Sequence, residues 1–222
     1  MLLKKCLKKK KFISKNLLVD VRNKNIIKKR FEAVVIGASA GGMKALNAIL
    51  SVLPANFPLP IIIVQHLHPH SDNHLAKILD SKCRLTVKQA DEKEKIENGI
   101  VYTAPPNYHL LIEEDKTFSL SIDIQVNFSR PAIDVLFETA IYAYRNRLIG
   151  IILTGANNDG SRGIKKIKEV GGYVIVQDPK TAETPIMPEA ALAITPVVDK
   201  ILPVEQIGDY LTYLVNSSNS IG

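Results

Sequence analysis

The chain has 222 residues, 46% of them hydrophobic, and a mean hydropathy near zero, which is enough to bury one substantial core. Its formal net charge of +7 is unevenly distributed, because residues 1–30 hold 12 Lys and Arg against one Asp. The rest therefore holds 17 Lys and Arg against 21 Asp and Glu, a net charge of −4, so no nucleic-acid-binding surface is expected on the folded part.

Residues 1–30 form a Lys-rich tail with no apolar stretch long enough for a signal peptide or a membrane span, so we expect a cytoplasmic protein. The composition predicts a disordered, solvated segment, with an arm that touches anionic lipid or nucleic acid as the alternatives. Cys6 and Cys83 lie far apart, without metal-type spacing, and no disulfide or catalytic role is expected of them. We expect one domain at residues 31–215 and a short C-terminal tail at 216–222.

After the tail, short β-rich runs alternate with amphipathic segments, which predicts an α/β fold: a doubly wound, mostly parallel sheet with helices on both faces and a small β-hairpin addition. Residues 31–37 predict the first strand, and apolar residues at helical spacing predict a helix that ends near Pro54. Residues 60–66 predict a central parallel strand, apolar on both faces. "SDNHLAKIL" then predicts a helix that starts behind a Ser/Asp cap.

Between residues 85 and 125, short β-like pieces separated by Asn-Gly, Pro-Pro and charged turns predict one strand and a hairpin. "RPAIDVLFETAIYAYRNR" predicts a helix with Pro131 in its first turn. "LIGIILTG" predicts another buried strand, and "ANNDG" a polar turn into a helix that carries Ile164 and Ile167. "GGYVIVQ" predicts a further strand and "QIGDYLTYLV" a closing helix.

Three polar residues stand at the ends of predicted strands: Ser39 follows the first, His66 ends the second, and Asp159 follows the strand in "LIGIILTG". Because the carboxyl ends of parallel strands share one edge of a sheet, we expect the three side chains to converge. A serine hydroxyl becomes a nucleophile when an imidazole takes its proton and a carboxylate orients that imidazole. "GASAG" also fits the G-x-S-x-G pattern, although the order Ser, His, Asp differs from that of the α/β-hydrolases. Each residue could instead be structural, as a helix cap or a hydrogen-bonded strand end.

Two other kinds of site use the same residues. "GASAGG" after a strand could bind a dinucleotide pyrophosphate, but the second strand ends in "VQH" without the acidic residue that would hold the ribose, and no Tyr-x-x-x-Lys occurs. Four histidines and one aspartate between residues 66 and 74 could form a hydrolytic metal site, but their spacing is a near miss and no histidine follows His109. We expect neither a metal nor an organic cofactor.

The sequence resembles the CheB-type chemotaxis protein-glutamate methylesterases over about residues 31–215. The resemblance is carried, in order, by "VVIGASAGG", "IIIVQH", "YTAPPNYHLLI", "SRPAIDVLF", "LTGANNDGSRGIKKIKEVGG", "VIVQDPKTAETPIMPEAA" and "ILPVEQI". It implies a doubly wound sheet and a site that hydrolyses glutamate γ-methyl esters on chemoreceptors with release of methanol. It also implies deamidation of particular receptor glutamines.

Carried over by position, the resemblance implies that Ser39 is the nucleophile, His66 the base and Asp159 the orienting carboxylate. The backbone N–H groups of Ala40 and Ala156 would hold the oxyanion. The implied partners are the methylated cytoplasmic helices of membrane chemoreceptors, with membrane contact only through the receptor or the basic tail.

The sequence departs from the family pattern in two turns. Ala40 stands where the family often has threonine, and Gly155-Ala156-Asn157 replaces a common Gly-Met-Gly or Gly-Thr-Gly. A backbone donor survives a change of side chain, and Asn157 tolerates the left-handed conformation that glycine favours. The altered turn leaves open a catalytically degenerate domain that binds receptor helices or another signalling protein. Since only the basic tail precedes the first strand, no phosphorylation control by a receiver domain in cis is expected.

Overall fold

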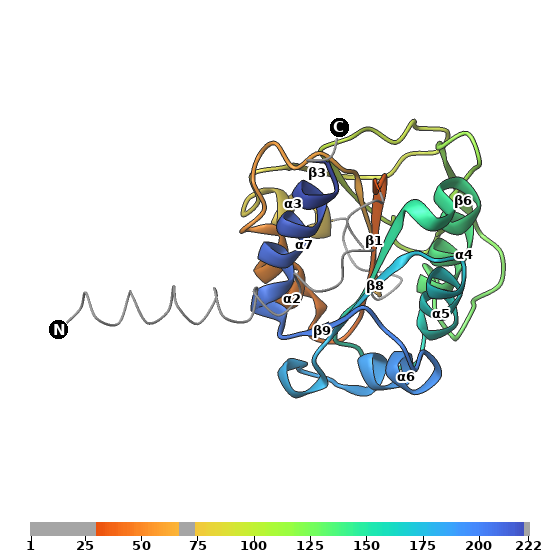
Figure 1. Cartoon of the computed structure of the whole chain (residues 1–222). Coiled ribbons are helices and arrows are strands. Elements are labelled where there is room, and N and C mark those ends of the chain that lie inside the picture. Colours follow the sequence, from red (N-terminus) through yellow and green to blue (C-terminus); the bar gives the residue numbers. More distant parts are fainter. Residues whose placement is uncertain (1–29, 67–73, 220–222) are drawn as a thin grey trace.

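The computed structural model describes residues 30–66 and 74–219 and contains one seven-stranded parallel sheet in the order β3-β4-β2-β1-β7-β8-β9 (Figure 1). The order reverses on either side of β1, as in doubly wound folds, where ligands bind beyond the carboxyl ends of the strands. The expected α/β fold with a doubly wound sheet is therefore confirmed. The strands are β1 (Ala33–Ala38), β2 (Ile61–Gln65), β3 (Thr86–Gln89), β4 (Ile100–Thr103), β7 (Leu148–Ile152), β8 (Tyr173–Gln177) and β9 (Lys200–Leu202).

Helices cover both faces of the sheet (Figure 1). One face carries α2 (Gly42–Leu50), α3 (His74–Asp80) and α7 (Val204–Asn219), and the other carries α4 (Ile133–Tyr144), α5 (Ser161–Glu169) and α6 (Ile186–Ile194). Short 3-10 helices follow α4 and β8, as η2 (Arg145–Arg147) and η3 (Pro179–Thr181). The predicted hairpin is present as antiparallel strands β5 (His109–Ile112) and β6 (Phe118–Ser121), which pack on the α4 side.

The central strands are apolar on both faces because each face is covered by helices. In β1, Val34 and Ile36 belong to the core beneath α2 and α7, whereas Val35 belongs to the core beneath α4. All three side chains are fully buried. The pairing of Gly37 with both Val64 and Ile152 aligns the carboxyl ends of β1, β2 and β7 at one edge of the sheet.

Several elements differ from the sequence expectations. The strands β3 and β9 were not predicted, because only Val87 is buried in β3 and no residue is buried in β9. The helix α6 was not predicted either. Helix α4 begins at Ile133, so Pro131 precedes its first turn, since Ala132 is extended. Helix α7 continues to Asn219, four residues into the expected C-terminal tail, because the buried Leu214 and Val215 anchor its last turns.

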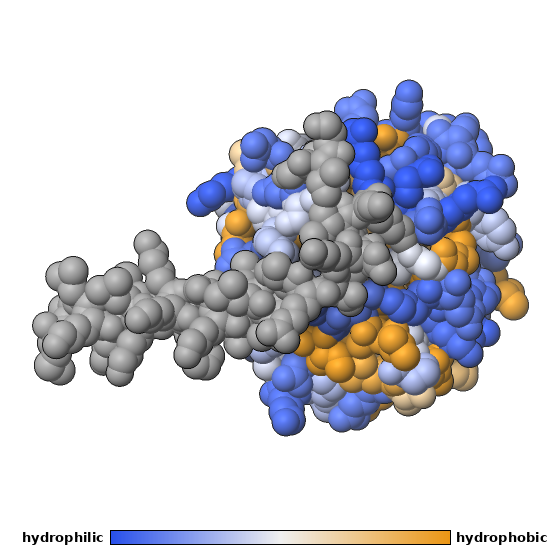
Figure 2. All heavy atoms as spheres, in the orientation of Figure 1, coloured by the Kyte–Doolittle hydropathy of each residue, from blue (hydrophilic) through white to orange (hydrophobic). Residues whose placement is uncertain are grey.

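Two features of the sequence lie outside the described residues: the basic tail up to residue 29 and the centre of the histidine-rich segment at 67–73. Among the described residues, no helix is long and apolar enough to cross a membrane. The visible surface is largely hydrophilic, with an apolar area at the lower edge of the view near α6 and β9 (Figure 2). These two elements carry the exposed side chains of Ile186, Ile194 and Ile201.

Candidate active site

Ser39 occupies the turn that joins β1 to α2, at the carboxyl edge of the sheet. Its backbone N–H donates to Thr154 O at 2.9 Å, and its carbonyl accepts from Gly42 N at 2.8 Å. The helix begins after Gly41, whose φ of 78° lies in the left-handed region that a residue with a side chain rarely adopts. This sharp turn holds Ser39, partly exposed, at the N-terminus of α2.

Gln65, the last residue of β2, ties the backbone of Ser39 to that of His66. Its side-chain Nε2 donates to Ser39 O at 2.8 Å and to His66 O at 2.9 Å, and the residue is only 5% exposed. The Gln65 Oε1 lies against Gly42, where an added Cβ would be 1.9 Å away. The amide therefore fixes the two turns relative to each other, and Gly42 is small because the amide occupies that space.

Thr154, just beyond β7, joins the Ser39 turn to the loop that leads to Asp159. Its hydroxyl donates to Ala40 O at 2.8 Å and accepts from Thr184 N at 2.9 Å. Its own N–H is held by the Gln177 side chain at 2.9 Å. The buried threonine thus fixes the backbone on both sides of the site.

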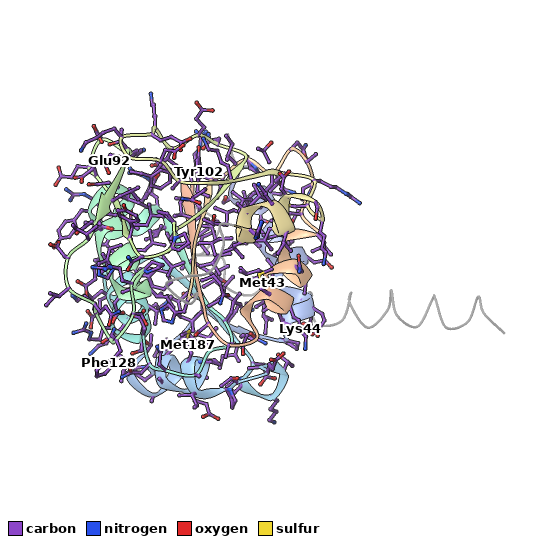
Figure 3. All side chains as sticks on the ribbon, turned by 180° about the vertical axis from the view of Figure 1, so that it is seen from behind. Met43, Lys44, Glu92, Tyr102, Phe128 and Met187 are labelled. Atoms are coloured by element: carbon purple, nitrogen blue, oxygen red, sulfur yellow. The ribbon has the colours of Figure 1, made fainter. Side chains whose placement is uncertain are left out.

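The N–H groups of Ala40 and Ala156 have no hydrogen-bond partner within residues 30–66 and 74–219, and both residues are exposed. Between their loops, Gly155 allows a close approach: an added Cβ would lie 2.9 Å from the Ser39 Cβ and 2.5 Å from the Met187 Cε. Unpaired amides beside a serine at a helix N-terminus can stabilise a developing oxyanion. In the lower half of Figure 3, the buried Met187 of α6 lies between the labelled Lys44 of α2 and Phe128 of the loop before α4.

His66 and Asp159 are in direct contact, as expected from their positions beyond the strands. The His66 Nε2 lies 2.8 Å from the Asp159 Oδ2, and the His66 side chain is 11% exposed while that of Asp159 is fully buried. Since an ionised carboxylate only accepts hydrogen bonds, Nε2 carries the proton. The Nδ1 of the neutral ring is then an acceptor.

The Asp159 carboxylate is held by many donors. Its Oδ2 accepts from Ile133 N at 2.6 Å, and its Oδ1 accepts from Asp134 N at 3.1 Å and Gly160 N at 2.9 Å. Burial by itself would raise the pKa of Asp159, but the hydrogen bonds from His66, Asn127 and Ile133 together with the attraction to His66 outweigh it and lower the pKa below its ordinary value. Asp159 is thus kept ionised in a dry environment.

The alternative expected for Asp159 was a structural role as a helix cap, and Asp159 does cap a helix, but not the one that follows it. The N-cap of α5 is Gly160, without a side-chain cap, whereas the Asp159 carboxylate accepts from the first amides of α4. Asp159 therefore caps a neighbouring helix and contacts the imidazole at the same time. Likewise, the N-cap of α2 is Gly41 rather than Ser39.

Four residues around these three were missed from the sequence: Gln65, Thr154, Asn127 and Asp134. A polar residue that ends an apolar strand, as Gln65 does, was the one available signal. The histidine-rich alternative lies partly outside the described residues, since His68, His70 and Asp72 belong to 67–73. Elsewhere in the described chain, no group of three metal-ligating side chains occurs, and His109 is buried with its ring bonded to Ile124 O and Ala132 N.

The chain is similar to known proteins in sequence and in fold. Residues 34–211 match the CheB methylesterase family. A Leptospira interrogans protein, provisionally assigned as a protein-glutamate methylesterase/protein-glutamine glutaminase, is 57% identical over 179 residues, which is 81% of this chain and 92% of that protein. A Thermotoga maritima protein-glutamate methylesterase/protein-glutamine glutaminase is 39% identical, and the match spans 82% of this chain but 54% of that protein.

The crystal structure of the Thermotoga maritima CheB methylesterase catalytic domain superposes with a TM-score of 0.79 at 39% identity. The superposition covers 83% of this chain and 99% of that domain. Sequence, fold and the matched range therefore point to the same group of carboxylic ester hydrolases. The chain belongs to the CheB methylesterase family.

Proposed function

We propose that this chain hydrolyses glutamate γ-methyl esters on chemoreceptors, with Ser39 as nucleophile, His66 as general base and Asp159 as orienting carboxylate. The observation that carries the proposal is the 2.8 Å contact between His66 and the buried Asp159. His66 comes one residue after β2, which pairs with β1, the strand that leads to Ser39. Receptor helices that bear the methylated glutamates are cytoplasmic, so the enzyme acts in the cytoplasm on this proposal.

The reaction proceeds in two balanced halves. The Ser39 Oγ attacks the ester carbonyl carbon while His66 Nδ1 takes the hydroxyl proton, and the resulting oxyanion is held by the amides of Ala40 and Ala156. His66 then gives the proton to the departing methoxide, which leaves as methanol. A water molecule, deprotonated by the same imidazole, then attacks the acyl-enzyme carbonyl carbon; the bond to Ser39 Oγ breaks, the imidazolium returns its proton to Oγ, and the glutamate is released.

A glutamine side chain would form the same acyl-enzyme, with ammonia as the leaving group. The proposed activity therefore includes deamidation, in line with the double name of the relatives. No resident cofactor takes part in this scheme, because the imidazole and two amides supply the base and the electrostatic stabilisation.

The test is methanol release from methylated receptor membranes by the wild type and by Ser39→Ala. We expect release by the wild type and a fall of about 10⁶ in the variant, the loss typical of removing a triad nucleophile. Phosphonylation of Ser39, abolished by His66→Ala, checks the same site without the receptor. Equal release by wild type and Ser39→Ala would exclude the triad, and binding of the receptor without release would favour the degenerate binding domain.

A further inference from the structure

Asn127 lies in the loop between β6 and α4 and places one nitrogen between two buried carboxylates. Its Nδ2 is 2.8 Å from the Asp159 Oδ1 and 2.9 Å from the Asp134 Oδ2. Asp134 is 1% exposed and Asp159 is fully buried. An amide nitrogen carries two hydrogens, so Asn127 can donate one to each carboxylate.

The two carboxylates are held close together, because Asp159 binds the N-terminus of the helix that contains Asp134, and Asp134 binds the N-terminus of the helix that follows Asp159. Asp159 accepts from the first amides of α4, and Asp134, which is part of α4, accepts from Gly163 N of α5 at 2.7 Å. Helix N-termini favour negative charge, which explains why both carboxylates lie there. Two buried like charges that share a donor still repel each other.

The backbone conformation of the loop at residues 126–129 places the Asn127 amide between the two carboxylates. Asn127 and Phe128 both have positive φ, at 51° and 60°, a conformation that is costly for an aromatic residue. Reciprocal backbone bonds between Val126 and Ser129, at 3.1 and 2.9 Å, close the turn around them. The Phe128 side chain is 97% exposed, so the packing of that ring does not stabilise the loop.

We propose that Asn127 is a positioning residue for ester hydrolysis, which divides its two amide hydrogens between Asp134 and Asp159 and so keeps the Asp159 carboxylate ionised and turned toward His66. The inference rests on the proposed function, since it acts through the triad carboxylate and does not require contact with the substrate. No other uncharged side chain of this length offers two hydrogens on one atom.

The charged and titratable groups that face Asp159 in the described chain come from three elements. His66 follows β2, Asp134 lies on α4, and Arg162 on α5 donates to Asp134 at 3.1 Å with its side chain 60% exposed. Without Asn127, the Asp159 anion loses a donor while Asp134 remains nearby. The pKa of Asp159 is therefore expected to rise when this donor is removed.

The experiment compares wild type, Asn127→Ala and Asn127→Ser in the hydrolysis of a small aryl ester. We expect kcat/KM to fall by about tenfold to a hundredfold in Asn127→Ala, as for loss of a hydrogen bond to a charged group. The acidic limb of the pH profile should move to higher pH. Asn127→Ser retains a single donor, so its kcat/KM should lie between those of wild type and Asn127→Ala. A role confined to folding would lower activity and the melting temperature without moving the limb.

Phe128→Ala is the matched control, since it changes the neighbouring residue but leaves the amide, and its rate should stay within about twofold of wild type. A second readout does not need activity: the ¹³C resonance of the Asp159 carboxyl should titrate at higher pH in Asn127→Ala. If Ser39→Ala hydrolyses the ester as fast as wild type, the proposed function fails. If hydrolysis depends on Ser39 but neither the limb nor the Asp159 titration moves, the role of Asn127 is refuted and the function stands.

Discussion

The two halves of the site differ in how their polar groups are satisfied. On the Asp159 side, one buried carboxylate accepts five hydrogen bonds, from His66, Asn127, Ile133, Asp134 and Gly160. On the Ser39 side, the amides of Ala40 and Ala156 are exposed and have no partner in the described part of the chain. In the proposed mechanism, the first half has its charge in place before substrate arrives, whereas the second keeps donors available for a charge that forms only during the reaction.

Among changes that leave Ser39 in place, the largest effect should come from breaking the saturated half with Asp159→Asn. The new NH₂ group would confront donors from His66, Ile133 or Asp134, and the imidazole would lose the acceptor that fixes its tautomer. We expect kcat to fall by about 10⁴. Steady-state kinetics with a small ester measures this, with Asp123→Asn on the exposed loop as control. A fall below tenfold would contradict the role of Asp159.

Gly155→Ala should disturb the close approach, within the Ser39 half, between the loop that carries Ala156 and the turn that carries Ser39. The new methyl group would overlap Met187 and press on Ser39, at 2.5 and 2.9 Å. We expect a loss of about 1–3 kcal/mol in unfolding free energy and a fall of about tenfold to a hundredfold in kcat. Gly99→Ala is the control, because its φ of 78° makes it destabilising at a site remote from Ser39. Equal kcat values in the two variants would contradict the contact argument.

Gln65→Leu should loosen the connection between nucleophile and base. The variant keeps the volume of the side chain but leaves the carbonyls of Ser39 and His66 without its donor. We expect kcat to fall by about tenfold and stability by about 1–3 kcal/mol, the cost of unsatisfied buried groups. Urea unfolding and kinetics well below the melting temperature separate the two effects. Unchanged kcat in a destabilised variant would assign Gln65 to folding alone.

The saturated half should also give the fold an acid sensitivity. The pKa of Asp159 is lowered in the folded state, so its contribution to stability is present above the ordinary value of 3.8 and is lost as the pH falls through the lower folded value. Urea unfolding at several pH values should therefore show that the stability difference between wild type and Asp159→Asn shrinks below pH 3.8. A difference that stays constant would mean that Asp159 is not specially stabilised as an anion.

The smallest effect should come from Ala156→Met in the open half. In the proposed mechanism only the backbone N–H of Ala156 binds the oxyanion, and the Ala156 side chain is exposed. We expect kcat on a small ester to stay within about twofold and the melting temperature to be unchanged. A large loss would show that the side chain, and not the amide alone, shapes the oxyanion site.

The difference between the halves also explains what could be predicted from the sequence. Ser39, His66 and Asp159 could be proposed from the sequence because each follows a strand of clear apolar character, and the sheet brings strand ends together. Asn127 and Asp134 could not be found this way, since their role depends on how a loop and two helices meet in space. Helix α6 was hidden by Pro188 in its first turn, a position that tolerates proline because its N–H needs no helical partner.

The position of β1 between β2 and β7 has a consequence for the order in which the protein folds. Ser39 and His66 come from neighbouring segments early in the chain, but β7 starts at Leu148 and pairs with Ala33, which closes a very long loop. Closing such a loop is entropically costly, and contacts of this range slow folding. Recovery of Ser39 reactivity during refolding would therefore report when β7 pairs with β1, one of the long-range steps of folding.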